Sequence, residues 1–240
     1  MSHLTLVRHG QASFLAEDYD QLSEIGMLQS ERLGEYWSSM TGTRFDVVVH
    51  GPAKRHGQTG AIVGEVFRKK GIHWPDPIEI PEFGEYQAFE LMRAAVPALR
   101  ERDAEVREMD ETFRRAEAPA EKMRAFERLF QRVTLSWVKG ELEASGVEPW
   151  AEFCARVGRG LARVRGEAGR HASVAVFTSA GPMSAVAAEA LELGAIKTLE
   201  LSWIARNSGY SEFLFSGGRF SLASFNAHPH ITERRLLTYR

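Results

Sequence analysis

The stretch LTLVRHGQAS, residues 4–13, decides how the rest of the chain is interpreted. Its first four residues are apolar or β-branched, which is typical of a short buried strand. The run ends at Arg8-His9-Gly10, where a glycine allows the backbone to turn or to approach a ligand closely. In open α/β sheets, ligands bind beyond the carboxyl ends of such strands. The pattern therefore predicts a functional turn immediately after an N-terminal strand.

Arg8 and His9 bring two kinds of chemistry to that turn. A guanidinium offers a planar fork of donors suited to phosphate or carboxylate. An imidazole can act as nucleophile, base or metal ligand. Arg-His-Gly alone is a weak motif, because a buried histidine at the end of a strand is equally compatible with it.

Composition narrows the class of protein. The 240 residues are 44% hydrophobic and 26% charged, which is ordinary for a globular domain. A net charge of −2 gives no reason to expect a nucleic-acid or membrane partner. Cys154 is the single cysteine, so an intrachain disulfide is excluded and a cytoplasmic location is expected. The early strand leaves no place for a signal peptide, and the spacing of His and Cys predicts no metal site or cofactor.

Apolar periodicity and turn residues predict the order of the elements. Strands are expected at 4–8, 45–50, 78–80 and 173–178, and a hairpin at 210–215 and 219–225 around Gly217-Gly218. Helices are expected at 24–40, from Pro52 to about 70, at 150–168 and from about 182 to 193. Residues 89–148 change to a charge-laced helical pattern, which favours an inserted helical cap within one domain spanning 1–240. Gly26 and Gly34 would each weaken the 24–40 helix by about 1 kcal/mol unless close packing requires them.

Two later strands end in the same way. The second is followed by Gly51-Pro52 and a helix carrying Arg55, and the 173–178 strand is followed by Ser179-Ala180-Gly181-Pro182 and another helix. Helix N-termini favour anions. Both helix starts are therefore expected at the sheet edge that holds Arg8 and His9.

In combination these segments resemble the histidine phosphatase superfamily, which has the phosphoglycerate-mutase-like fold. The resemblance rests on LVRHG at 6–10, LSEIGMLQ at 22–29, GPAKRHGQTG at 51–60, the strand and small-residue turn at 174–181, and Asn226 with His230 near the end. Residues from about 89 to 148 are not covered by it. The resemblance implies an α/β three-layer sandwich, a mostly parallel sheet with helices on both faces, with the cap inserted.

The resemblance also implies roles for residues. His9 would take the phosphoryl group and pass it to water, while Arg8 and Arg55 would bind the phosphoryl oxygens. A glutamate would protonate the leaving oxygen, and Glu82 is favoured over Glu85, which lies on the other side of Gly84. Two neighbouring arginines would lower the pKa of His9 and keep it neutral for attack. Metal would then be unnecessary.

One position departs from the family pattern. Members usually carry a second histidine after the late strand, and Ser179 stands in its place here. A serine can donate one hydrogen bond but carries no charge. His50, at the end of the second strand, and His230 are the alternatives considered as a replacement imidazole. Gln11 and Ser13 are expected to line the mouth of the pocket.

The expected activity is hydrolysis of a small phosphomonoester through a phosphohistidine intermediate. Two alternatives stay open: a phosphoglycerate mutase-type phosphoryl transferase, and a weakly active or inactive protein that binds a phosphorylated ligand or a partner. The Ser179 departure motivates the second alternative. The sequence identifies neither the substrate nor the oligomeric state, and a dimer is compatible with it.

Overall fold

The computed structural model describes residues 1–12, 20–142 and 144–239. The chain forms two compact units. One comprises Met1–Glu85 together with Ala155–Arg240, and the other comprises Tyr86–Cys154. The predicted candidate site residues within the described ranges all belong to the first unit. The helical insertion expected at 89–148 falls within the second, and its description as a cap of a single domain stays a prediction.

The first unit is built on a six-stranded mixed sheet with the order β3-β2-β4-β1-β5-β6. The four strands from β3 to β1 are parallel, and β5 and β6 add an antiparallel hairpin beside β1. The strands are β1 (Ser2–Arg8), β2 (Val47–His50), β3 (Ile78–Glu79), β4 (Ser173–Thr178), β5 (Tyr210–Ser216) and β6 (Arg219–Ala227). Because β1, β4 and β2 are parallel neighbours, the residues after Arg8, Thr178 and His50 emerge at one edge.

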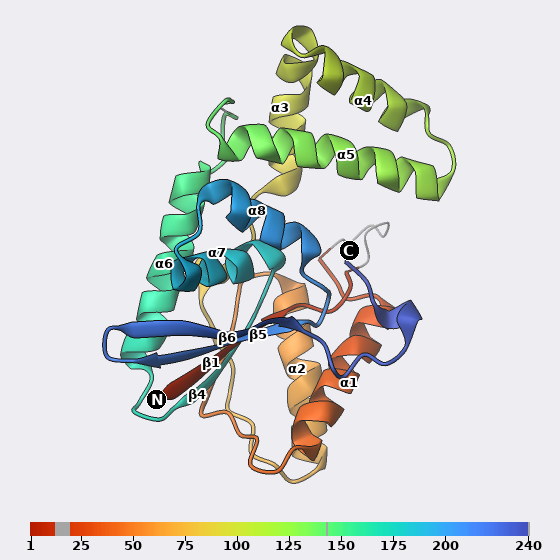
Figure 1. Cartoon of the computed structure of the whole chain (residues 1–240). Coiled ribbons are helices and arrows are strands. Elements are labelled where there is room, and N and C mark those ends of the chain that lie inside the picture. The colour runs from red at the N-terminus through yellow and green to blue at the C-terminus, as the bar shows by residue number, and fades with distance from the viewer. Residues whose placement is uncertain (13–19, 143, 240) are drawn as a thin grey trace. The chain divides into compact units, whose positions relative to one another are not determined.

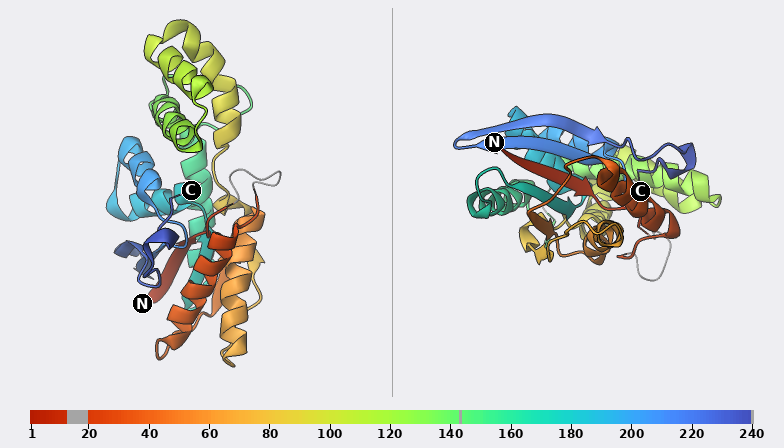
Figure 2. Two further views of the ribbon diagram at one scale, coloured as in Figure 1. Left: turned by 90° about the vertical axis from the view of Figure 1, so that its right-hand side faces the viewer. Right: turned by 90° about the horizontal axis from the view of Figure 1, so that it is seen from below.

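Two helices cover one face of this sheet. α1 (Glu24–Ser39) and α2 (Lys54–Lys69) pack against each other, as Figures 1 and 2 show. The core beneath them contains Leu33, Trp37, Val63 and Phe67 from the helices and Val7, Val48, Ala175 and Phe177 from the strands. Successive side chains of a strand point to opposite faces, so Leu6 and Val176 face the other way. Both are completely buried.

Helices that follow the insertion complete the first unit. α6 (Trp150–Glu167) enters it, and α7 (Ala180–Leu191) contacts β1, β6 and α8 (Ala195–Ile204). Figure 1 shows α7 and α8 on the side of the sheet away from α1 and α2. Helices therefore flank the sheet on both faces, and the predicted α/β class is confirmed.

Within its described residues, the second unit contains three complete helices and the first turn of α6. The complete helices are α3 (Ala88–Arg102), α4 (Ala104–Arg115) and α5 (Pro119–Val138). Asp110 of α4 is buried and accepts hydrogen bonds from Arg100 and Arg114. A cluster of aromatic rings supplies much of the core, formed by Tyr86, Trp137, Trp150 and Phe153. No helix in the described part of the chain is long and apolar enough to cross a membrane.

Most elements lie where the sequence predicts, with two corrections. α2 begins at Lys54, because Ala53 still has an extended backbone, so Pro52 is not the first helical residue. α8 was not predicted. It follows α7 after Glu192, which has a left-handed backbone (φ 54°). Its N-cap is Gly194, and no side chain caps it, so the sequence AIKTLELSWI lacks the polar capping residue that commonly marks the start of a helix.

Gly10 and Gly26 mark the place where the turn after β1 crosses the start of α1. A β-carbon on Gly26 would lie 2.1 Å from the carbonyl oxygen of Gln11, and one on Gly10 would lie 2.4 Å from the oxygen of Gly26. Gly34 similarly faces Val66 of α2, where a β-carbon would lie 2.9 Å from the valine Cβ. Close packing therefore explains why glycines stand at positions 26 and 34 of this helix, although each lowers its intrinsic stability.

We expect Gly26→Ala to lower the free energy of unfolding by about 1–3 kcal/mol or more, because backbone atoms of Gln11 must move to admit the methyl group. Gly158→Ala on α6 is the matched control, since a β-carbon there meets nothing within 4 Å. It should be neutral or raise stability by up to about 1 kcal/mol. Urea unfolding of the two variants measures both changes. Equal stability of the two variants would contradict the close crossing.

His230 gives the fold a pH dependence. Burial, and to a lesser degree nearby His228, lower the pKa of His230 from 6.5 to about 4. Its Nε2 shares a 2.8 Å hydrogen bond with the hydroxyl of Ser208, and its ring packs between Tyr36 and Tyr210. Between pH 6.5 and 4 the unfolded chain thus binds more protons at this residue than the folded chain does.

Stability attributable to His230 should therefore be complete above about pH 6.5 and should fall as the pH drops toward 4. The loss at pH 4 is about 3 kcal/mol, on the scale of 1.36 kcal/mol per pKa unit. Urea unfolding of wild type and His230→Gln at several pH values tests this, and the variant should show the shallower decline. Parallel pH profiles would refute the assignment.

Candidate active site

Five side chains from separate segments converge beyond the carboxyl ends of β1 and β4. His9 follows β1, Arg55 and His56 lie in the first turn of α2, Ser179 is the N-cap of α7, and Glu85 follows the short 3₁₀ turn Pro81–Phe83. The backbone holds the first of these in place, since the N–H of His9 donates to the carbonyl of Thr178 at 2.8 Å. The edge predicted from strand order is thus the one at which these residues meet.

His9 is 95% buried and is held in one tautomer. Its Nδ1 lies 2.6 Å from the carbonyl oxygen of Gly10. A carbonyl can only accept, so Nδ1 carries the proton and Nε2 keeps its lone pair. Arg55 Nε donates to that Nε2 at 3.1 Å. The unprotonated nitrogen of a neutral imidazole therefore faces a guanidinium.

Electrostatics keep His9 neutral. Burial is the largest cause and holds the pKa of His9 well below 6.5, and the charges of Arg55 and Arg8 lower it further. The hydrogen bond to Gly10 acts in the opposite direction without reversing the shift. Protonation would place a third cation among two guanidiniums in a site that excludes water.

Arg55 is fixed by contacts on several sides. Its NH1 donates to Asp20 Oδ1 at 2.7 Å, and its backbone carbonyl accepts from Thr59 Oγ1 at 2.8 Å. The same Thr59 oxygen accepts from the N–H of Gly10 at 3.1 Å, which ties α2 to the turn after β1. Arg8 is buried and donates to the carbonyl of Ala205. Both arginines thus lie beside His9, as the sequence predicts.

His56 is the residue that the sequence interpretation missed. It is completely buried, its ring centroid lies 5.6 Å from that of His9, and its Nε2 shares a 2.7 Å hydrogen bond with Ser179 Oγ. Burial, followed by the charge of Arg55, holds the pKa of His56 well below 6.5. A signal was present in the segment GPAKRHGQTG at 51–60, because the resembling family segment reads Ser-Pro-x-x-Arg-Ala-x-x-Thr-Ala, with an alanine where this chain has His56.

The two candidate glutamates lie in different surroundings. A carboxylate oxygen of Glu85 accepts from the N–H of Gly181 at 3.1 Å, two residues after Ser179. Glu82 instead lies against α6, where its Cβ would be 2.8 Å from a β-carbon on Gly160, and its carbonyl accepts from Arg156. The structure therefore brings Glu85, rather than the favoured Glu82, next to Ser179.

The remaining predicted residues lie around this cluster. His50 is half-buried and donates from Nδ1 to the carbonyl of Gly51, and its ring lies near Gly57 of α2. Gln11 accepts from Ser23 Oγ through its side chain and donates from its backbone to Gln29. His230 packs on Tyr210, as described above. Ser13 lies outside the described residues.

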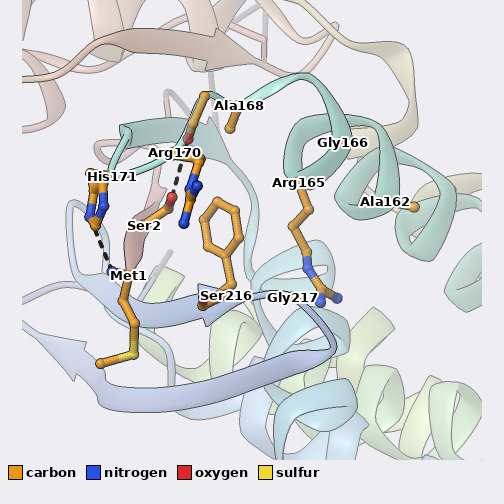
Figure 3. Close-up of a pocket in the computed structure, with 12 residues that line it drawn as sticks. Met1, Ser2, Ala162, Arg165, Gly166, Ala168, Arg170, His171, Ser216 and Gly217 are labelled. Atoms are coloured by element: carbon orange, nitrogen blue, oxygen red, sulfur yellow. Dashed lines mark hydrogen bonds between the residues drawn. The ribbon is translucent and has the colours of Figure 1, made fainter.

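Elsewhere in the first unit, a hollow of about 690 Å³ lies at the opposite ends of the strands (Figure 3). It is lined by Met1 and Ser2 at the start of β1, by residues 168–171 before β4, by the β5–β6 turn, and by Arg165 of α6. None of the predicted site residues lines it.

Among the described residues, no three His, Cys, Asp or Glu side chains gather as a metal-binding group, so no metal ligand is assigned.

Comparison with solved structures places this arrangement among known folds. A putative alpha-ribazole-5'-P phosphatase from Escherichia coli is 17% identical with a TM-score of 0.63, over 95% of this chain and 97% of the other. A mycobacterial glucosyl-3-phosphoglycerate phosphatase is 16% identical with a TM-score of 0.61, over 95% and 99%. A phosphoserine phosphatase from Entamoeba histolytica is 14% identical with a TM-score of 0.63, over 96% and 100%. At these identities the likeness concerns the fold.

Curated protein sequences give no match. The family model described as histidine phosphatase superfamily (branch 1) matches residues 4–134 and 87–228, which together span nearly the whole chain. With the strand order and the Arg8–His9–Arg55 cluster already described, this match gives the assignment: the chain belongs to the histidine phosphatase superfamily, branch 1.

Proposed function

We propose that this protein is a phosphomonoester hydrolase that works through a phosphohistidine at His9 and needs no metal ion. The observation that carries the proposal is the state of His9: Nδ1 is bonded to a carbonyl, and the lone pair of Nε2 faces the guanidinium of Arg55. A neutral nucleophile beside a fixed cation suits phosphoryl transfer, where positioning and charge neutralisation dominate catalysis. A cytoplasmic location is part of the proposal and agrees with a single cysteine.

The reaction has two steps. His9 Nε2 attacks phosphorus, an N–P bond forms, and the bond from phosphorus to the ester oxygen breaks while that oxygen takes a proton from an acid. Water then attacks the phosphohistidine: an O–P bond forms, the N–P bond breaks and returns its electron pair to His9 Nε2, the water's proton passes to the carboxylate, and inorganic phosphate leaves. Arg8 and Arg55 neutralise the oxygens of the transferring group in both steps.

We assign the acid to Glu85 rather than to Glu82. Its carboxylate is bonded to the N–H of Gly181, at the start of the helix that Ser179 caps. A phosphate dianion bound beside that carboxylate would raise its pKa and favour the protonated form that the leaving oxygen needs.

The substrate is not assigned beyond a small phosphomonoester. The structural relatives named above are phosphatases of different phosphorylated compounds. No contact of the described residues favours return of the phosphoryl group to the substrate, so the mutase alternative gains no support. Ligand binding without turnover is separated from hydrolysis by the experiments that follow.

We expect His9→Ala to lower kcat for an aryl phosphate at least about 10³-fold, because the variant lacks the imidazole that forms the N–P bond. Rapid acid-free quenching and mass mapping of wild type should locate the phosphoryl group on His9. His3→Ala is the control, since His3 is exposed on the same strand, and it should leave kcat near wild type. Label on another residue, activity in His9→Ala, or loss of wild-type activity with a chelator would overturn this mechanism.

The general-acid assignment predicts a dependence on the leaving group. Glu85→Gln should lower kcat about 10²–10⁴-fold for an alkyl phosphate, whose leaving oxygen needs a proton, and much less for p-nitrophenyl phosphate. Glu82→Gln, the matched variant three residues earlier, should change neither substrate appreciably. Steady-state kinetics of both variants with both substrates make the comparison. A selective loss of alkyl phosphate turnover in Glu82→Gln instead would transfer the role to Glu82.

A further inference from the structure

The unusual feature of this site is that position 179 lacks the family's second histidine, while a different imidazole, that of His56, lies against the serine that stands there. By the family pattern, a histidine is expected at position 179 and a small residue at 56, whereas this chain has Ser179 and His56. The structure brings the two together at 2.7 Å, although 123 residues separate them in sequence. Both side chains are essentially fully buried, so the pair is an internal contact beside His9.

We propose that His56 is a positioning residue, which orients the Ser179 hydroxyl so that it donates to the transferring phosphoryl group. Together the two side chains supply the hydrogen bond that a single histidine at position 179 supplies in the family pattern. This inference rests on the proposed phosphatase function. It adds a residue, His56, that the resemblance does not mark.

The direction of the hydrogen bond follows from what surrounds the imidazole. His56 Nδ1 is buried and makes no well-aligned hydrogen bond; the acceptor near it is the carbonyl of Gly51, which already accepts from Nδ1 of His50 at 2.8 Å. A well-aligned hydrogen bond is stronger than a poorly aligned one, so the proton is better placed on Nε2, where Ser179 Oγ accepts it at 2.7 Å. The hydroxyl hydrogen of Ser179 is then released from the imidazole and can point to an anion.

The position of Ser179 makes an anion the natural acceptor. Ser179 occupies the N-cap position of α7, so its hydroxyl lies at the positive end of a 12-residue helix. In the first turn of that helix, the N–H of Gly181 donates to the carboxylate of Glu85. The His56 ring lies 5.6 Å from that of His9, the proposed nucleophile. A phosphoryl group on His9 would thus be near the hydroxyl, and chains of hydrogen bonds strengthen one another in such a buried site.

A purely structural role does not account for a buried imidazole at position 56. Burying an imidazole with one nitrogen that makes no well-aligned hydrogen bond costs free energy that an apolar side chain would not cost. The groups that face it are Arg55, His50 and His9, which disfavour a charged imidazolium. His56 therefore stays neutral and contributes a fixed dipole rather than a charge. A neutral imidazole is sufficient to orient the hydroxyl of Ser179.

A double-mutant cycle tests the inference with p-nitrophenyl phosphate. Ser179→Ala and His56→Ala should each lower kcat about 10²–10³-fold, the usual effect of losing one preorganised donor, while KM changes little. The double variant His56→Ala/Ser179→Ala should be no worse than either single variant, because the two residues act as one unit. His56→Ala/Ser179→His, which restores the family arrangement, should recover at least 10-fold over His56→Ala.

Two kinds of control distinguish the proposed role of His56 from a role in packing, and distinguish its failure from failure of the proposed phosphatase function. Urea unfolding identifies any variant that loses kcat by losing its fold, and Ser179→Ala removes a single oxygen atom. Losses that multiply in the double variant, or an unchanged kcat in Ser179→Ala, would overturn the inference while leaving the phosphatase assignment intact. If wild type turns over no monoester, the proposed function fails. The same cycle is then measured as affinity for orthovanadate by calorimetry, where a non-additive loss supports the pair and an additive loss refutes it.

Discussion

The proposed active site depends on one constraint: the imidazole of His9 must stay neutral although the charges of two guanidiniums, those of Arg55 and Arg8, act on it. The carbonyl of Gly10 fixes the proton on Nδ1, and Arg55 donates to Nε2. Burial and the two positive charges lower the pKa of His9 in the same direction. The geometry that offers a lone pair to phosphorus is therefore the same geometry that prevents protonation from removing it.

The sheet topology makes this arrangement available. β1, β4 and β2 are adjacent parallel strands, so the segments after them begin at one edge although their residues lie far apart in sequence. The backbone then approaches unusually closely around that edge. A β-carbon on Gly51 would lie 2.5 Å from the carbonyl oxygen of Phe83, which brings the start of α2 toward the turn that carries Glu85. Glycines thus tighten the contact between segments that the strand order has only brought near.

What the sequence reveals and conceals follows from the range of each interaction. Strands, hairpin and most helices depend on local periodicity, and Arg8, His9 and Arg55 stand in motifs with fixed spacing to these elements. The partnership of His56 with Ser179 depends on how α2 faces α7, which no local pattern records. The choice between Glu82 and Glu85 depends on the direction of a turn that begins at Pro81 and ends near Gly84. A shift of three residues there decides whether a carboxylate meets Gly160 of α6 or the N-terminus of α7.

The contacts of Arg55 show how the site is prepared for an anion. Asp20 accepts from its NH1 at 2.7 Å, and His9 accepts from its Nε, so the fork of the guanidinium is oriented by groups on either side. The Asp20 carboxylate is about one-third exposed, whereas the Arg55 side chain is largely buried. In the proposed mechanism, an arriving phosphoryl group displaces the Arg55 Nε hydrogen bond from His9 Nε2, while the bond to Asp20 keeps the guanidinium beside the developing charge. The proposed pairing of His56 with Ser179 follows the same logic, because an oriented hydroxyl dipole can stand in for an imidazole where two guanidiniums already supply the positive charge.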